Sequence, residues 1–119
     1  MKYLPAVLLL SAMLLLTAAS AHAFAVYNSV DATVDVTKDW RMGIPLFKVG
    51  PNGTYNGEHG AGLDSVYVWW VAAKLTCYSS ENFSIPKGGF ARIYKSEVKI
   101  YDHQNKHLRS AGVGNAPCD

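Results

Sequence analysis

The sequence predicts an all-β fold, a small single-domain β-sandwich or partly open barrel of about five to seven strands with one disulfide. Residues 30–37 alternate strictly between apolar and polar side chains, which is typical of a half-buried strand. Residues 66–75 are apolar and begin with β-branched and aromatic side chains, which favour a strand over a helix. Asn-Gly and Gly-Gly pairs separate such runs, and the chain has no long helical period, repeat or low-complexity segment.

The first 23 residues have the pattern of a secretory signal peptide. Lys2 provides a positive start, residues 7–16 are almost entirely apolar, and small residues lead to Ala23. The apolar stretch is short for a membrane span, and no second one follows it. We therefore expect a signal peptide over residues 1–23 and a single secreted β domain over residues 24–119. This domain would be extracellular, or periplasmic if the source is a Gram-negative bacterium, without stable membrane insertion.

The small-x-small rule for signal cleavage is met at two places. A cut after Ala23 leaves Phe24 first, and a cut after Ala21 leaves His22 first. An N-terminal His22 would offer both its amine and its ring to a metal, and in this one respect it resembles the secreted copper enzymes that oxidise polysaccharides. In the other case His22 leaves with the signal peptide, and we then expect neither a metal nor a cofactor.

Cys77 and Cys118 are the only two cysteines. Export would place them in an oxidising compartment, where a pair of thiols is expected to close. The pair lacks the CxxC spacing of metal sites. We predict a Cys77–Cys118 disulfide that closes a loop of about 40 residues and stabilises the fold by about 4 kcal/mol.

The charge of the chain is close to balanced. It has 11 Lys and Arg against 9 Asp and Glu, with a formal net charge of +2. Proteins that bind nucleic acid through its phosphates normally show a basic excess or a clustered basic face. Only four basic residues fall close together in the sequence, namely Lys95, Lys99, Lys106 and Arg109. We interpret them as side chains on a solvated strand edge or hairpin. We expect no nucleic-acid partner.

Further elements follow from the middle of the chain. Residues 46–49 are apolar and precede an Asn-Gly pair, which predicts a hairpin turning at Asn52. A glycine-rich loop then covers residues 52–64. The strand over residues 66–75 is apolar on both faces, so either another segment covers Trp70 or Trp70 lies in an exposed aromatic patch.

The sequence of the C-terminal third predicts a turn followed by a hairpin. Residues 86–89 read Pro-Lys-Gly-Gly, which is typical of a turn. Residues 94–101 alternate as an amphipathic strand, with Tyr101 on its polar side. A polar turn over residues 102–106 and a last strand over residues 106–113 would complete a hairpin.

The aromatic residues, 3 Trp, 7 Tyr and 4 Phe, are more numerous than a core of this size needs. Tyr and Trp contribute most at protein contacts and sugar platforms because they bury a large area at low entropic cost. We expect a binding face that includes the glycine-rich loop and members of one set of aromatic residues. This set consists of Trp40, Tyr55, Trp70 and Tyr78. The preferred function is a small, secreted, non-enzymatic binding protein that recognises an extracellular protein or a glycan.

A small secreted hydrolase is the alternative, and it would use Glu58, His59 and Arg92. Residues 91–94 (ARIY) are similar to the arginine-bearing strand of the small microbial ribonucleases, and this resemblance implies a ribonuclease-like activity. Those enzymes carry a catalytic histidine close to the C-terminus, where this chain has none beyond His107. A secreted toxin or virulence effector at a host surface is a third interpretation, and it is compatible with the binding mechanism.

Two glycosylation triplets begin at Asn52 and Asn82, both in segments predicted to be loops. If the source is eukaryotic, both are candidate acceptors of a glycan. A bacterial source would make them accidental.

Overall fold

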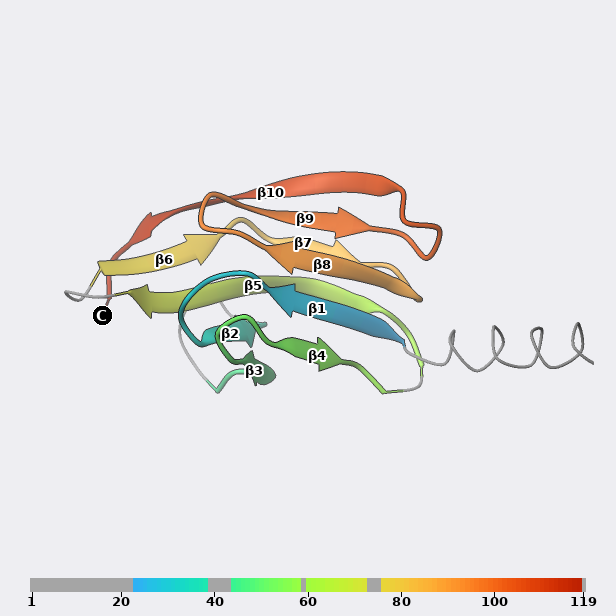
Figure 1. The fold of residues 1–119 in the computed structure, drawn as a ribbon, viewed down its shortest axis with the longest axis horizontal. Coiled ribbons are helices and arrows are strands. Elements are labelled where there is room, and N and C mark those ends of the chain that lie inside the picture. The colour runs from blue at the N-terminus through green and yellow to red at the C-terminus, as the bar shows by residue number, and fades with distance from the viewer. Residues whose placement is uncertain (1–22, 39–43, 59, 73–75, 119) are drawn as a thin grey trace, which may run out of the picture.

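The computed structural model describes residues 23–38, 44–58, 60–72 and 76–118. Within these residues the chain forms ten β-strands and no helix, arranged as one nearly closed, barrel-like sheet (Figure 1). The all-β prediction is confirmed. Across the same described ranges, no helix has the length and apolarity needed to cross a membrane.

The strands in chain order are β1 (Phe24–Asn28), β2 (Val34–Thr37), β3 (Phe47–Val49), β4 (Thr54–Asn56), β5 (Leu63–Ala72), β6 (Thr76–Ser80), β7 (Phe83–Ile85), β8 (Gly89–Ile93), β9 (Glu97–Tyr101) and β10 (His107–Ala116). The predicted count of about five to seven strands is therefore wrong. Strands β3, β4 and β7 have three residues each, which is too short to show an alternating pattern in the sequence.

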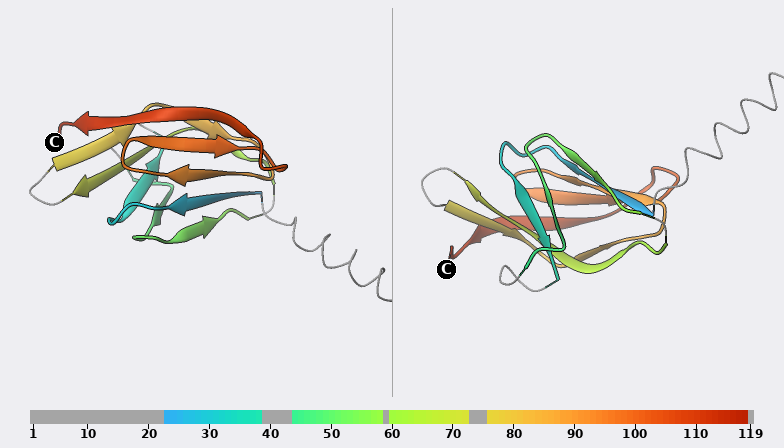
Figure 2. Two further views of the ribbon diagram at one scale, coloured as in Figure 1. Left: turned by 45° about the horizontal axis from the view of Figure 1, so that its top comes forward. Right: turned by 90° about the horizontal axis from the view of Figure 1, so that it is seen from below.

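Hydrogen bonds join the strands in the order β3-β2-β5-β6-β10-β9-β8-β1-β4, and β7 pairs with β5. Neighbours on this path are antiparallel except β1 and β8, which run parallel. β10 belongs to both halves of the barrel, since residues 107–112 pair with β9 and residues 113–116 pair with β6 (Figure 2). The two end strands of the order, β3 and β4, leave a seam along one side.

The core fills the barrel with the inward-facing residues of most strands. On β5, Val66, Val68 and Trp70 are buried, and only 2% of the Trp70 surface is exposed. The alternate residues of β5 face outwards, and Val71 is 43% exposed. The idea of an exposed patch centred on Trp70 is wrong, because its side of the strand faces the core.

The predicted strand over residues 30–37 is shorter in the structure, where β2 covers Val34–Thr37. A buried side chain explains the difference. Asn28 is 3% exposed, and its Nδ2 donates to the carbonyls of Ala32, Val49 and Gly50 at 2.8, 3.2 and 2.9 Å, while its Oδ1 accepts from the Val30 amide at 2.8 Å. These bonds hold the loop after β1 against the end of β3, so the alternation there does not mark a strand.

The turn at Asn52 is confirmed, whereas the hairpin is not. The amide of Gly53 donates to the carbonyl of Gly50 at 2.9 Å, and Asn52 takes a positive φ of 55°. Pro51 in the second position and a positive φ in the third are typical of a type II turn. The flanking strands pair elsewhere, β3 with β2 and β4 with β1, so the turn links the two edges of the seam.

The turn at residues 86–89, the C-terminal hairpin and the disulfide are confirmed, although the strand predicted over residues 94–101 covers only Glu97–Tyr101 and the last strand extends to Ala116. Residues 94–96 instead turn between β8 and β9, where the Tyr94 amide donates to the Glu97 carbonyl at 2.8 Å. The amide of Gly89 donates to the Pro86 carbonyl at 2.8 Å, and Gly88 takes a φ of 78°. β9 and β10 form an antiparallel hairpin around the turn over residues 102–106. The disulfide joins Cys77 at the start of β6 to Cys118 after β10.

Candidate functional site

Strands β4, β1, β8, β9 and β10 lie side by side and form one half of the barrel (Figure 2). The register of β1, β8, β9 and β10 places two adjacent rows of side chains on its outer surface. Strand register aligns Ala25, Phe90, Tyr101 and His107 in one row. It aligns Tyr27, Arg92, Lys99 and Ser110 in the next. The inward neighbours Ala91, Ile93, Val98 and Ile100 are buried, so the two rows face away from the core.

We call six of these residues the outer aromatic face: Tyr27, Phe90, Arg92, Lys99, Tyr101 and His107. Phe90 stacks on Tyr101 with ring centroids 4.7 Å apart and 12° between the planes. Tyr27 meets Phe90 edge to face at 5.7 Å, and the His107 ring lies 5.4 Å from that of Tyr101. The rings therefore form a continuous ladder from β1 to β10, about 14 Å wide at ordinary strand spacing.

Two cations stand beside this ladder. The guanidinium carbon of Arg92 lies 4.8 Å from the centroid of Tyr27 and 5.5 Å from that of Phe90. Lys99 is paired with Arg92 in the register, and its Nζ lies 5.7 Å from the Tyr94 ring. Guanidinium groups over ring faces gain cation–π energy while keeping their N–H groups available to acceptors. The site combines exposed donors with half-buried apolar area.

Ring orientation limits which ligand this face can take. Phe90 and Tyr101 turn one face to each other, and Arg92 lies over Phe90 from another side. A sugar ring that stacks on an aromatic platform needs an open ring face, whereas aromatic residues and arginine together are enriched at protein interfaces. The contacts among Phe90, Tyr101 and Arg92 leave little open ring face for a stacking sugar.

Of the aromatic residues predicted to bind, Trp70 and Tyr78 are brought together. They are register partners on β5 and β6, and their rings stack at 5.3 Å with 22° between the planes. Trp70 is buried and Tyr78 is half-buried. Tyr55 lies elsewhere, against Phe47 and the core, and Trp40 falls outside the described residues.

The structure describes two of the three residues of the hydrolase alternative. Glu58 is exposed beyond the end of β4, Arg92 is on the outer aromatic face, and His59 lies outside the described residues, as does His22. The one salt bridge among the described residues joins Lys48 to Asp35 at 3.3 Å. The same part of the chain contains no group of three or more His, Cys, Asp or Glu side chains that could hold a metal ion.

The glycine-rich loop is held at both ends. The Gly57 amide donates to the Phe24 carbonyl at 2.8 Å, and a Cβ at Gly57 would lie 2.3 Å from the Phe24 ring. A Cβ at Gly62 would lie 2.0 Å from the Ile85 carbonyl oxygen. These glycines therefore allow the loop to pack closely against its neighbours. The loop also lies next to the row that contains Phe90, because Asn56 is the register partner of Ala25 in that row.

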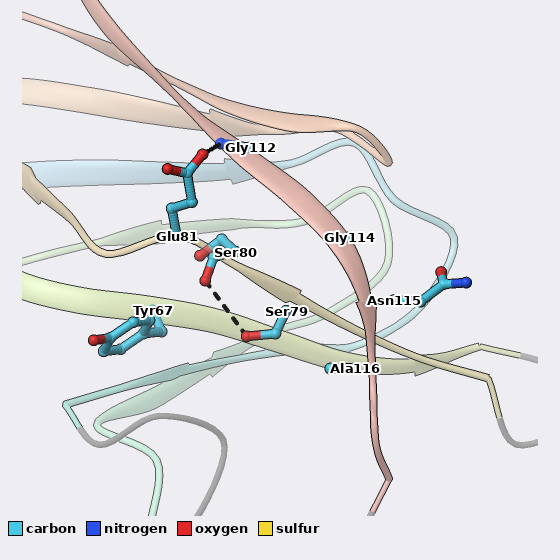
Figure 3. A pocket seen from close by; sticks show the side chains of 8 residues that line it. All are labelled: Tyr67, Ser79, Ser80, Glu81, Gly112, Gly114, Asn115 and Ala116. Atoms are coloured by element: carbon cyan, nitrogen blue, oxygen red, sulfur yellow. Dashed lines mark hydrogen bonds between the residues drawn. The ribbon is translucent and has the colours of Figure 1, made fainter.

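A shallow groove of about 440 Å³ lies on the opposite half of the barrel, over β5, β6 and the C-terminal part of β10 (Figure 3). Short residues line most of it, beside the ring of Tyr67. The one charged group that lines it, Glu81, already accepts from the Gly112 amide at 2.8 Å. The groove lacks the converging free polar groups of a binding site.

Tyr27, Phe90, Tyr101 and His107 were not among the candidate functional residues predicted from the sequence. The available signal was Tyr101, an aromatic residue on the polar side of an amphipathic strand. Tyr27 and Phe90 gave no such signal, because β1 and β8 were not predicted as strands and their outward positions were therefore unknown. No protein-family model, curated protein or solved structure matches this chain.

Proposed function

We propose that this chain is a secreted, non-enzymatic binding protein that contacts an extracellular protein through the outer aromatic face. The observation that carries the proposal is the ladder of Tyr27, Phe90, Tyr101 and His107 with Arg92 held against it. Aromatic residues and arginine are enriched in the energetically dominant part of protein interfaces. The disulfide supports export, because such bonds persist in oxidising compartments.

The charge on this face also selects the partner. Arg92 and Lys99 are adjacent in the register, and neither is in a salt bridge within the described residues. A partner that places a carboxylate opposite them gains charge-assisted hydrogen bonds and faster association. The partner is therefore a protein whose contact surface combines an acidic group with apolar side chains.

Site-specific photo-crosslinking tests the proposal. A benzophenone amino acid replaces Tyr101 on the outer aromatic face or, as the matched control, Tyr67 on the opposite half of the barrel. Each protein is added to the extracellular fraction of the native source and irradiated. We expect a discrete crosslinked protein from position 101 that is absent from position 67, and equal labelling from both positions would contradict the proposal.

Two substitutions then measure the contribution of the face. Arg92→Ala and Phe90→Ser should each weaken affinity for the identified partner by about tenfold or more, as hot-spot residues do. Lys87→Ala, in the turn at residues 86–89, is the control and should leave affinity unchanged. If an immobilised glycan binds instead and loses binding with the same substitutions, the ligand is a glycan and the protein-contact proposal is wrong.

A further inference from the structure

A second site, separate from the outer aromatic face, involves the C-terminal end of β5 and the segments that follow β1 and β8. These three strands point in the same direction (Figure 1). A cavity of about 350 Å³ opens at this site. The loop after β1 contributes Val30, Asp31 and Ala32, β5 and β6 contribute Trp70, Val71, Ala72 and Tyr78, and the turn after β8 contributes Lys95. This volume is at the lower end of the range for small-molecule sites, so it suits a ligand of one ring and a short polar group.

The aromatic wall of this cavity is fixed in place. Trp70 stacks on Tyr78 at 5.3 Å, and Trp70 is locked in the core with 2% of its surface exposed. The side chain of Tyr78 is half-buried beside it. A planar apolar group can bind against the Tyr78 ring, which Trp70 supports from behind, without first ordering it, and this lowers the entropic cost of binding.

The loop wall is fixed as well. The buried Asn28 amide donates to the carbonyls of Ala32 and Gly50, and its Oδ1 accepts from the Val30 amide. The Ser29 amide donates to the Ile93 carbonyl at 3.0 Å. These hydrogen bonds hold the backbone of the loop after β1 in place, so this wall of the cavity is preformed.

Two residues of opposite charge, Asp31 and Lys95, are among those that line this cavity. Both side chains are exposed. They form no salt bridge with each other, since the one salt bridge among the described residues joins Lys48 to Asp35. A ligand that brings its own ammonium and carboxylate can satisfy both of them at once. Its apolar part would occupy the space beside Trp70 and Tyr78.

We propose that this cavity binds a small aromatic zwitterion, that is, an aromatic amino acid or a short peptide made of such residues. The ring lies against the Trp70–Tyr78 stack, the ammonium faces Asp31, and the carboxylate faces Lys95. The ring and the two charges each contribute to the affinity. A free amino acid and a peptide differ in the distance between the two charges, which the experiment uses to separate them.

NMR titration of the disulfide-bonded protein tests the site with four probes. These are L-phenylalanine, the dipeptide Phe-Phe, phenethylamine without the carboxylate, and 3-phenylpropionate without the ammonium. We expect a zwitterionic probe to shift the Trp70 indole N–H resonance and the amides of residues 30–32 and 95. The two singly charged probes should bind about two- to fivefold more weakly, the range that exposed ion pairs give.

Charge variants assign the two contacts. Asp31→Asn should weaken the zwitterion and phenethylamine but not 3-phenylpropionate, and Lys95→Gln should weaken the zwitterion and 3-phenylpropionate but not phenethylamine. Glu58→Gln and Lys87→Gln are the matched controls, since neither residue lines the cavity. A stronger response to Phe-Phe than to phenylalanine identifies the peptide as the ligand, and the reverse identifies the free amino acid.

A filling variant keeps the proposal testable without touching the aromatic stack. Ala72→Leu places a larger side chain in the cavity and should abolish the shifts, while its amide spectrum elsewhere remains that of the folded protein. The proposal is overturned if no zwitterionic probe shifts these resonances at millimolar concentration. Equal affinity of all probes for the wild type, or unchanged affinity in both charge variants, would overturn it as well.

Discussion

The rings of Phe47 and Tyr55 stack across the seam of the barrel, with centroids 3.8 Å apart and 7° between their planes. Phe47 lies on β3 and Tyr55 on β4, the two end strands of the sheet order. Phe24 on β1 packs against both rings, at 6.0 and 6.1 Å. Side-chain packing thus closes the barrel where the ladder of backbone hydrogen bonds stops.

A double-mutant cycle measures the stack that closes the seam. We expect Phe47→Ala and Tyr55→Ala each to lower the free energy of unfolding by about 2 kcal/mol, below the range for fully buried rings because both are half-buried. The coupling between them should be about 1 kcal/mol, as for other aromatic pairs. Chemical denaturation measures these values, and Tyr55→Leu, which keeps apolar volume but not the ring, is the control. A coupling of zero would show that the stack does not contribute.

Loss of the disulfide should have a larger effect. Cys77 and Cys118 are separated by 41 positions, and closing a loop of this length stabilises a fold by about 4 kcal/mol in the chain-entropy account. We expect the Cys77→Ser, Cys118→Ser double variant to lose about this much in urea denaturation. Strands β6 and the end of β10 should exchange their amide hydrogens fastest in the variant. Unchanged stability would mean that the β10–β6 pairing alone holds the C-terminus.

The residue at which the chain is made to begin should affect stability. Ala23 is 4% exposed, and its carbonyl accepts from the Gly88 amide at 2.7 Å. A chain that begins at Phe24 loses this acceptor, so we expect it to be about 1 kcal/mol less stable than chains that begin at His22 or Ala23. For a domain of this size the melting temperature should differ by roughly 4–8 °C. Equal melting temperatures for chains beginning at Ala23 and Phe24 would contradict this prediction.

The stability of the turn between β9 and β10 should depend on pH through the protonation of Asp102. Hydrogen bonds from the Lys106 and Gln104 amides, at 2.9 and 2.8 Å, and the nearby positive charges of His103 and Lys106 hold the pKa of Asp102 below its ordinary value of 3.8, with desolvation acting in the opposite direction. Because the pKa of Asp102 is lower in the folded chain, ionised Asp102 stabilises the fold at any pH above its ordinary pKa. This stabilisation is lost as the pH falls through the lowered pKa of the folded chain.

NMR titration of the two amides checks this pH dependence. The Gln104 and Lys106 resonances should move together, with a midpoint below 3.8. Asp102→Asn keeps an acceptor oxygen but cannot ionise, so the transition should vanish in that variant. A midpoint at or above the ordinary value would contradict the prediction.

The two glycosylation triplets should differ in use when the chain is made in a eukaryotic secretory host. Asn52 is exposed in its turn. At Asn82 the amide is occupied, since Nδ2 donates to the Val66 carbonyl at 3.3 Å and Oδ1 accepts from the Ser65 hydroxyl at 3.2 Å. A glycan on that Nδ2 would displace these bonds.

Mass spectrometry of the secreted protein measures glycan occupancy at both positions. We expect a glycan at Asn52, with chains modified at Asn82 retained in the cell. Asn52→Gln should remove the glycan from the secreted pool, whereas Asn82→Gln should leave it in place. A secreted, folded pool with full occupancy at Asn82 would show that the structure tolerates a glycan there.

The fold class, the disulfide and the C-terminal hairpin could be predicted from local information. The alternation of Val98 and Ile100 with Lys99 depends on a period that the strand itself imposes. The turns at Asn52 and Gly88 follow from residues that tolerate positive φ. The disulfide followed from a count of two, which leaves a single pairing.

Pairing over long distances along the chain was decided by the tertiary structure alone. The periodic pattern shows that a strand has two faces, but on β5 both faces are apolar, so only packing shows that Trp70 faces inwards. Both candidate sites arise in the same way. Phe90 meets Tyr101, and Asp31 faces the same cavity as Lys95, because strand register brings distant segments together. Local propensities carry no information on that register, since it is set by how the whole apolar surface is buried at once.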